Sequence, residues 1–325
     1  MKIFITGATG FVGSSVLKYL LETENEIFVL YRSEKTFSEQ FKAVIQNKTN
    51  VNLVKGDVLD KESMKIAAEC DVTLFLACNS RWGTLETEST LNIATVGTRN
   101  CLEIVGPNKR FVYVSSAAAM MFDADFDQKQ FLEMDKINKN EFIYSKAKYG
   151  AEQIVKELSQ NYVILRPGEI YDREDFQLIT AQNVIDYMRQ PAICIKGGVS
   201  ITNRQSVAKT ITEAAFTAHI NQLYSLGGDN ITIGELARSI QKVSGHGHMY
   251  FELGYKFAFK MCKFLGKFGI KLFELEAVKY CGFNWFVDSE PAKEKLGYVV
   301  GSSEEILEEV VDWLNERTKS QKKEK

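Results

Sequence analysis

A glycine-rich segment near the start of the chain limits most strongly how the protein can fold. Residues 6–13 read TGATGFVG and lie between an apolar run, Lys2–Thr6, and a helical pattern over residues 11–22. Glycines at these places permit a tight turn, a close approach of the backbone to a phosphate, and close packing of the helix on the strand. Amides at the start of the helix then face the phosphates. This context favours a dinucleotide-binding turn over a purely structural one, with contacts from Gly7, Thr9, Gly10, Phe11, Val12 and Gly13.

The first half of the chain alternates short apolar runs with amphipathic helical patterns. Further strands are predicted at Glu26–Tyr31 and at residues 51–54, 72–76, 110–115 and 162–165. Strands separated by helices indicate a parallel sheet with helices on both faces, which is a doubly wound α/β fold of the Rossmann type. We expect residues 1–165 to form this dinucleotide-binding core. Residues 166–325 are expected to be mainly a smaller substrate-binding lobe, with a strand at 222–226 and a helix that return to the core.

Composition excludes several classes of protein. A net charge of −2 gives no overall attraction to nucleic acid or to an anionic membrane, and no apolar run is long enough to span a bilayer. The six cysteines are scattered, and no signal-peptide pattern precedes the first strand, so a cytoplasmic address is expected. His246 and His248 lack a third candidate ligand, and no metal site is predicted.

A tyrosine and a lysine four residues apart begin a later helical pattern. Residues 144–148 read YSKAK, so Tyr144 and Lys148 lie one turn apart on the same helix face. A phenol with its ordinary pKa of about 10 is a poor base at neutral pH. A nearby ammonium, together with a positively charged nicotinamide ring, favours the phenolate. The pair is therefore predicted to move the proton that accompanies a hydride transfer.

The GxxGxxG spacing and the YxxxK pair resemble the extended branch of the short-chain dehydrogenase/reductase superfamily. Within that branch, residues 286–298 are most similar to 3β-hydroxysteroid-dehydrogenase-like and dihydroflavonol-reductase-like enzymes. The resemblance implies a hydroxyl donor to the reacting oxygen at Ser116, and contacts with the cofactor from Ser115, Tyr144 and Lys148. It also implies an adenine contact, a ribose wall and a segment beside the nicotinamide amide, formed by Asp57 and Val58, by Leu76, Ala77 and Cys78, and by Pro167 and Gly168. A homodimer is the arrangement usual in the family.

The second predicted strand ends in Tyr31, Arg32 and Ser33 rather than in a carboxylate. A carboxylate at this place usually binds the ribose 2′-hydroxyl of NAD, whereas a guanidinium can bind a 2′-phosphate. Arg32 therefore favours NADP(H), with NAD(H) as the alternative.

Several neighbours of the expected catalytic residues differ from those of related enzymes. Ala117 and Ala118 stand where the sugar dehydratases of the family carry their Asp-Glu acid and base, and Ala94 replaces an asparagine. The segment in which epimerases place a phosphate-binding arginine has Arg204 nearby. These differences favour a dehydrogenase or reductase acting on a hydroxyl or carbonyl carbon of a small substrate, with an apolar substrate as one option. A nucleotide-sugar epimerase and a non-catalytic dinucleotide-binding sensor or scaffold remain the alternatives.

The segment 250–286 combines many aromatic residues with lysines at 256, 260, 263, 267 and 271 that share one helical stripe. The favoured interpretation is a solvated lysine face opposite aromatic residues that point into the core. Two other interpretations are a cover over an apolar pocket and a peripheral contact with an anionic membrane.

Overall fold

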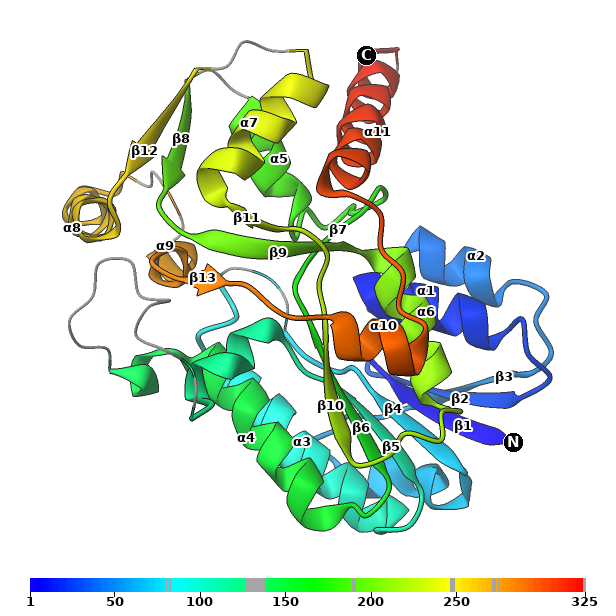
Figure 1. The fold of residues 1–325 in the computed structure, drawn as a ribbon. Helices are drawn as coiled ribbons and strands as arrows, with labels where there is room; N and C mark the ends of the chain where they lie inside the picture. The colour runs from blue at the N-terminus through cyan, green and yellow to red at the C-terminus, as the bar shows by residue number, and fades with distance from the viewer. Residues whose placement is uncertain are drawn as a thin grey trace.

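A seven-stranded parallel sheet forms the centre of the part of the chain that the structure describes (Figure 1). This computed structural model describes residues 1–323 except 80, 82, 125, 127–137, 189–190, 246–248, 271–272 and 274. The strand order is β10-β6-β5-β4-β1-β2-β3, and every neighbouring pair is parallel. The strands are β1 (Lys2–Thr6), β2 (Glu26–Tyr31), β3 (Val51–Lys55), β4 (Val72–Phe75), β5 (Arg110–Val114), β6 (Tyr162–Pro167) and β10 (Gln222–Leu226). The predicted doubly wound α/β fold is confirmed.

Helices cover both faces of this sheet because successive strand residues point to opposite sides. In β1, Ile3 and Ile5 belong to one buried cluster and Phe4 to the other. The first face is covered by α1 (Phe11–Leu20), α2 (Glu39–Ile45), α6 (Arg204–Ala214) and α10 (Glu290–Leu296). The second is covered by α3 (Glu88–Val105), α4 (Ile143–Leu158) and the 3-10 helix η2 (Lys61–Glu69).

A second group of elements lies above the large sheet in Figure 1. Its strands are β7 (Glu169–Tyr171), β8 (Ala192–Ile195), β9 (Gly198–Asn203), β11 (Asn230–Thr232), β12 (Tyr250–Leu253) and β13 (Asn284–Trp285). Its helices are α5 (Ala181–Met188), α7 (Ile233–Val243), α8 (Tyr255–Gly266), α9 (Leu275–Cys281) and α11 (Ser303–Lys323). A separate apolar cluster made largely by α5, α7 and α11 holds this group together.

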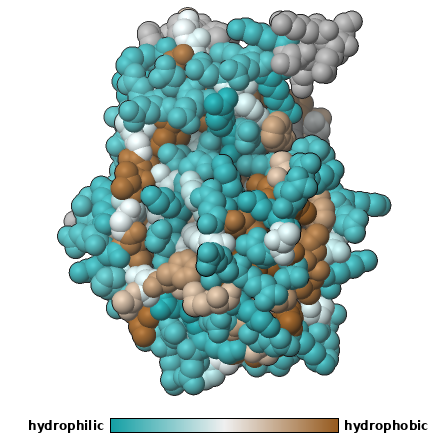
Figure 2. All heavy atoms as spheres, turned by 90° about the vertical axis from the view of Figure 1, so that its right-hand side faces the viewer, coloured by the Kyte–Doolittle hydropathy of each residue, from teal (hydrophilic) through white to brown (hydrophobic). Residues whose placement is uncertain are grey.

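The chain passes between the two groups more than once. After leaving the sheet at β6 it forms β7 and β9, and it returns through α6, which packs against α1, and through β10, which pairs with β6. None of the described helices is long and apolar enough to cross a membrane. Figure 2 shows the side of the molecule that faces right in Figure 1. Hydrophilic residues cover most of this side, with smaller hydrophobic areas between them.

Candidate functional site

The glycine turn has the geometry that a bound phosphate requires. Gly7 has a φ of +76°, and the amide of Gly10 donates a hydrogen bond of 3.1 Å to its carbonyl oxygen. A Cβ on Gly13 would lie 2.1 Å from that oxygen, so α1 approaches the end of β1 more closely than any side chain permits. The N-cap of α1 is Gly10, and no side chain caps the first amides. The turn therefore fits the pyrophosphate of a dinucleotide.

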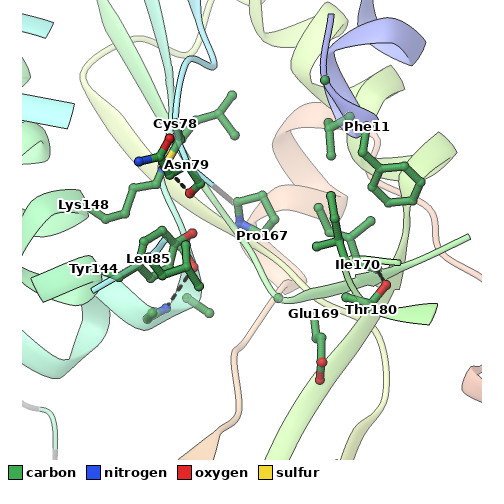
Figure 3. A pocket seen from close by; sticks show the side chains of 18 of the residues that line it. Phe11, Cys78, Asn79, Leu85, Tyr144, Lys148, Pro167, Glu169, Ile170 and Thr180 are labelled. Carbon is green, nitrogen blue, oxygen red and sulfur yellow. Dashed lines mark hydrogen bonds between the residues drawn. The ribbon is translucent and has the colours of Figure 1, made fainter. Parts of the chain in front are cut away.

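A cavity of about 540 Å³ extends from this turn to the second group of elements. It is lined by every residue that the sequence predicts for the site: Gly7, Thr9, Gly10, Phe11, Val12, Gly13, Arg32, Asp57, Val58, Leu76, Ala77, Cys78, Ser115, Ser116, Tyr144, Lys148, Pro167 and Gly168. Figure 3 shows Tyr144 and Lys148 on one side, Phe11 and Ile170 on the other, and Pro167 between them. Residues far apart in the chain thus meet around one space.

Lys148 is buried behind Tyr144. Its Nζ donates a 2.9 Å hydrogen bond to the carbonyl of Val114 and lies 6.0 Å from the centre of the Tyr144 ring. Burial by itself would lower the pKa of Lys148, but the interactions with Cys78, Tyr113 and Tyr144 outweigh it, and the pKa is raised. Lys148 therefore stays charged at neutral pH.

Tyr144 experiences opposing influences on its proton. Burial raises the pKa of the phenol, whereas Lys148 and a hydrogen bond with the Ser116 hydroxyl lower it, and the net direction is upward. Lys148 lowers the pKa of Tyr144, as its position one turn away predicts. In the protein alone, burial raises this pKa by more than Lys148 lowers it. Tyr144 thus holds a proton that it can donate.

Glu86 fixes the start of the helix that carries this pair. Its two carboxylate oxygens accept hydrogen bonds from the backbone amides of Ile143 (3.0 Å) and Tyr144 (3.1 Å). The Tyr280 hydroxyl of α9 donates to the same carboxylate at 2.7 Å, and Lys279 lies 3.8 Å away. A negative charge at a helix N-terminus is favourable, so Glu86 anchors α4 as well as α9. Sequence reasoning missed this residue because its partners are far away in the chain.

A buried polar network lies behind the two serines. Glu152, one turn after Lys148 in α4, accepts hydrogen bonds from the Ser115 hydroxyl (2.5 Å) and from Nε and Nη2 of Arg166 (2.8 and 2.6 Å). Arg166 also forms an ion pair with Asp123. The network joins β5, α4 and β6, so it fixes the end of β5 relative to the helix. The sequence places Glu152 on the face of Lys148 by its spacing, a signal for this buried carboxylate.

A carboxyl group lies among the apolar residues of the cavity. Glu169 follows Pro167 and Gly168, and its Oε1 accepts a 2.9 Å hydrogen bond from the side-chain amide of Asn183. Burial raises its pKa to about 7, although hydrogen bonds from Tyr171 and Asn183 act in the opposite direction. Glu169 therefore changes charge near neutral pH.

The second group of elements contributes mostly apolar side chains to the cavity: Ile193, Ile195, Val199, Leu236, Phe273, Val278, Phe283 and Trp285. Arg32 and Lys148 are the arginine and lysine among the described residues that line the cavity. The second group of elements adds two acidic residues, Glu169 and Asp186. Arg204 is buried over the ring of Phe11 and forms ion pairs with Asp172 and Glu174.

Within the described residues, no three histidine, cysteine or acidic side chains are grouped so that they could hold a metal ion. His246 and His248 lie outside the described residues.

Comparisons with known proteins agree with this fold. The chain is 24% identical to a putative dihydroflavonol 4-reductase from Synechocystis sp. over 96% of its own length and 94% of the relative. The crystal structure of gox2253 is similar with a TM-score of 0.75 and 25% identity, covering 97% of this chain and 98% of that one. A UDP-glucuronic acid 4-epimerase from Bacillus cereus, solved with a UDP-sugar analogue and NAD, is similar with a TM-score of 0.70 and 18% identity, covering 97% and 99%.

A family profile for NAD dependent epimerases and dehydratases matches residues 3–193, more than half of the chain. The protein is therefore an NAD(P)-dependent enzyme of the short-chain dehydrogenase/reductase type and belongs to the NAD dependent epimerase/dehydratase family.

Proposed function

We propose that the protein is a dehydrogenase or reductase that interconverts a hydroxyl and a carbonyl group on an apolar substrate, with Tyr144 as the acid/base. The observation that carries the proposal is the single cavity in which the glycine turn, the Tyr144–Lys148 pair and an apolar wall meet. The nicotinamide cofactor supplies the hydride chemistry, and the protein supplies position and a proton.

Three side chains have distinct parts in the proton transfer. Tyr144 donates its proton to the carbonyl oxygen in reduction, or accepts one in the reverse direction. Lys148 stays charged and makes the phenolate that follows less unfavourable. Ser116, hydrogen-bonded to Tyr144, holds the reacting oxygen in place.

The charges of the cavity support an apolar substrate rather than a nucleotide sugar. A sugar nucleotide carries a diphosphate, which arginine side chains bind well. In the described lining, the lobe offers apolar residues and two carboxyl groups instead, and Arg204 is engaged by its own acidic partners. We assign the substrate wall mainly to residues 166–325 and the cofactor site mainly to residues 1–165. We also propose NADP(H) as the preferred cofactor, on the position of Arg32.

The proposal is tested by mixing the purified enzyme with NADPH or NADH and a panel of apolar ketones and aldehydes. We expect stoichiometric loss of reduced-cofactor absorbance with at least one member of the panel. Tyr144→Phe should lower kcat by roughly 10²- to 10⁴-fold and change cofactor binding much less, because the hydroxyl that moves the proton is lost while the ring that lines the cavity is kept.

Tyr149→Phe is the matched control, since Tyr149 lies in the same helix and stacks on Phe122 with ring centres 5.4 Å apart. Equal losses in the two variants would refute a special role for Tyr144.

A sugar epimerase is the second candidate, favoured by the family profile. An epimerase inverts its substrate without net change in the cofactor, so product analysis by NMR separates it from a reductase. Tight cofactor binding with no turnover of any compound would indicate a sensor or scaffold instead.

A further inference from the structure

The outward side of α8 and of the turn that follows it carries two adjacent stripes of unlike character. Lys256, Lys260, Lys263 and Lys267 are exposed and fall within about 60° of the helix circumference at 100° per residue. Beside them, Phe257, Phe264 and Phe268 are 62%, 58% and 67% exposed. We call these seven residues the α8 face. Lys271 of the predicted stripe lies outside the described residues.

The opposite side of α8 accounts for its attachment to the protein. Tyr255, Ala258 and Cys262 are buried and form a cluster with Ile195 of β8 and Val278 of α9. The interpretation of a lysine face over core-facing aromatic residues is therefore wrong for three phenylalanines, which point into solvent. In Figure 1, α8 lies at the outer left edge of the molecule, next to β12, β8 and α9.

We propose that the α8 face binds the surface of an anionic lipid bilayer. Adjacent exposed aromatic and lysine side chains match such a surface, because the rings enter the headgroup–acyl boundary while the ammonium groups stay beside the acidic headgroups. The net charge of −2 for the whole chain makes this local basic stripe distinct from the rest of the molecule.

A second copy of the chain fits the face less well than a bilayer. A two-fold contact through α8 would bring two sets of four lysines together, and like charges across an interface oppose association. Exposed aromatic side chains alone would suit either a second copy of the chain or a bilayer, but the lysines favour a partner with an acidic surface.

The position of α8 connects the surface with the cavity. Val278 belongs to the cluster that holds α8 and also lines the cavity, as do Phe273 and Cys281 nearby. A bilayer on the α8 face would therefore lie on the same side as the apolar wall of the cavity. The binding itself does not depend on the proposed function, because it involves none of the catalytic residues.

The test is co-sedimentation of the full chain with vesicles of phosphatidylcholine alone or mixed with phosphatidylglycerol. We expect binding to the acidic vesicles that weakens with added salt, since screening reduces attraction between exposed charges. Charge reversal of Lys260, Lys263 and Lys267 to Glu should weaken it by about fivefold per lysine or more. Replacing Phe257, Phe264 and Phe268 by Ser should weaken it by at least about tenfold.

Matched controls are Lys65→Glu with Lys293→Glu and Lys295→Glu, which change the net charge equally on other surfaces, and Phe216→Ser, which removes another exposed ring. Thermal unfolding of each variant establishes that it is folded. Binding that the controls keep and the α8 variants lose supports the proposal. Absence of binding to acidic vesicles, equal binding to both vesicle types, or a dimer that the phenylalanine variants dissociate would overturn it.

Discussion

Arg32 lies directly after β2 with 62% of its side chain exposed, and Asp57 is 3.9 Å away. An ion pair this long and this exposed holds the guanidinium weakly, so Arg32 can turn toward a more highly charged partner. A 2′-phosphate offers such a partner through a bidentate contact. The charge at this one residue is the basis for the proposed cofactor preference.

Arg32→Ala should raise the KM for NADPH by about 10- to 100-fold, the equivalent of one charged hydrogen-bonding contact of about 1.5–3 kcal/mol. The KM for NADH should change little, because its ribose carries no phosphate. Initial-rate kinetics with both cofactors measure this. Lys35→Ala removes a neighbouring exposed charge and should affect neither; equal losses for the two cofactors in Arg32→Ala would contradict the prediction.

Glu169 is a carboxyl group whose pKa of about 7 lies well above its ordinary value of 4.5. Between these two values the folded protein keeps a proton that the unfolded chain has lost. The free energy of unfolding that depends on this group is therefore highest below about pH 4.5. It falls as the pH rises from there through about 7. The loss amounts to about 3 kcal/mol, from 1.36 kcal/mol for each pH unit.

Glu169→Gln removes this titration and keeps an oxygen that can accept from Asn183. The melting temperature of the variant should rise relative to that of the native protein as the pH increases from 5 to 8. Thermal unfolding across that range measures the difference. Glu308→Gln, which alters an exposed carboxylate, should show a difference that is constant with pH. A constant difference for Glu169→Gln as well would show that the carboxyl titrates in its ordinary range.

At the scale of single elements, α4 concentrates the chemistry of the site. Its first turn is held by Glu86 and presents Tyr144, its second presents Lys148, and its third buries Glu152 against Arg166. Breaking a buried ion pair by removing one partner typically costs 3–5 kcal/mol, so the third turn is tied firmly to the sheet. The helix thus has polar anchors on both sides of the Tyr144–Lys148 pair, to which we assign the proton transfer.

Glu86→Ala should lower kcat more than it raises the KM for the cofactor, because the amides of Ile143 and Tyr144 lose their acceptor and Tyr144 is positioned less firmly. Loss of a helix cap also costs about 0.5–2 kcal/mol, which thermal unfolding measures. Glu86→Gln keeps an acceptor oxygen and should restore part of kcat. Glu88→Ala, an exposed change in the first turn of α3, should leave kcat unaltered and cost only about 0.3–1 kcal/mol, the contribution of a charge at a helix N-terminus. A loss of stability without any change in kcat would make Glu86 merely structural.

For the whole molecule, the sequence was sufficient to predict those features that depend on residues close together in the chain. The apolar runs of β1 and β2, the glycines at 7, 10 and 13, and the i, i+4 spacing of Tyr144 and Lys148 all depend on residues close together in the chain. The partners of Glu86 are 57 to 194 residues away, and those of Arg166 include Asp123, 43 residues earlier. Local patterns carry no information on such contacts.

The same reason explains the second half of the chain. The strands β7, β9, β11 and β13 are short, between two and six residues, and they pair across large sequence separations. Helical periodicity located the lysines of α8 correctly on one stripe, but it could not decide which of the remaining stripes faces the core. That choice depends on β8 and α9, which cover only one side of the helix.

The shared carboxylate of Glu86 also constrains how this enzyme can be re-engineered. Its side chain is 5% exposed and receives Tyr280 from α9 in addition to the two amides of α4. A chimera that exchanges the C-terminal segment for that of another family member removes Tyr280 and leaves a nearly enclosed negative charge with fewer donors. Lobe grafts onto this scaffold should therefore succeed chiefly when the donor sequence brings a hydroxyl to the place of Tyr280, or when Glu86 is exchanged along with the graft.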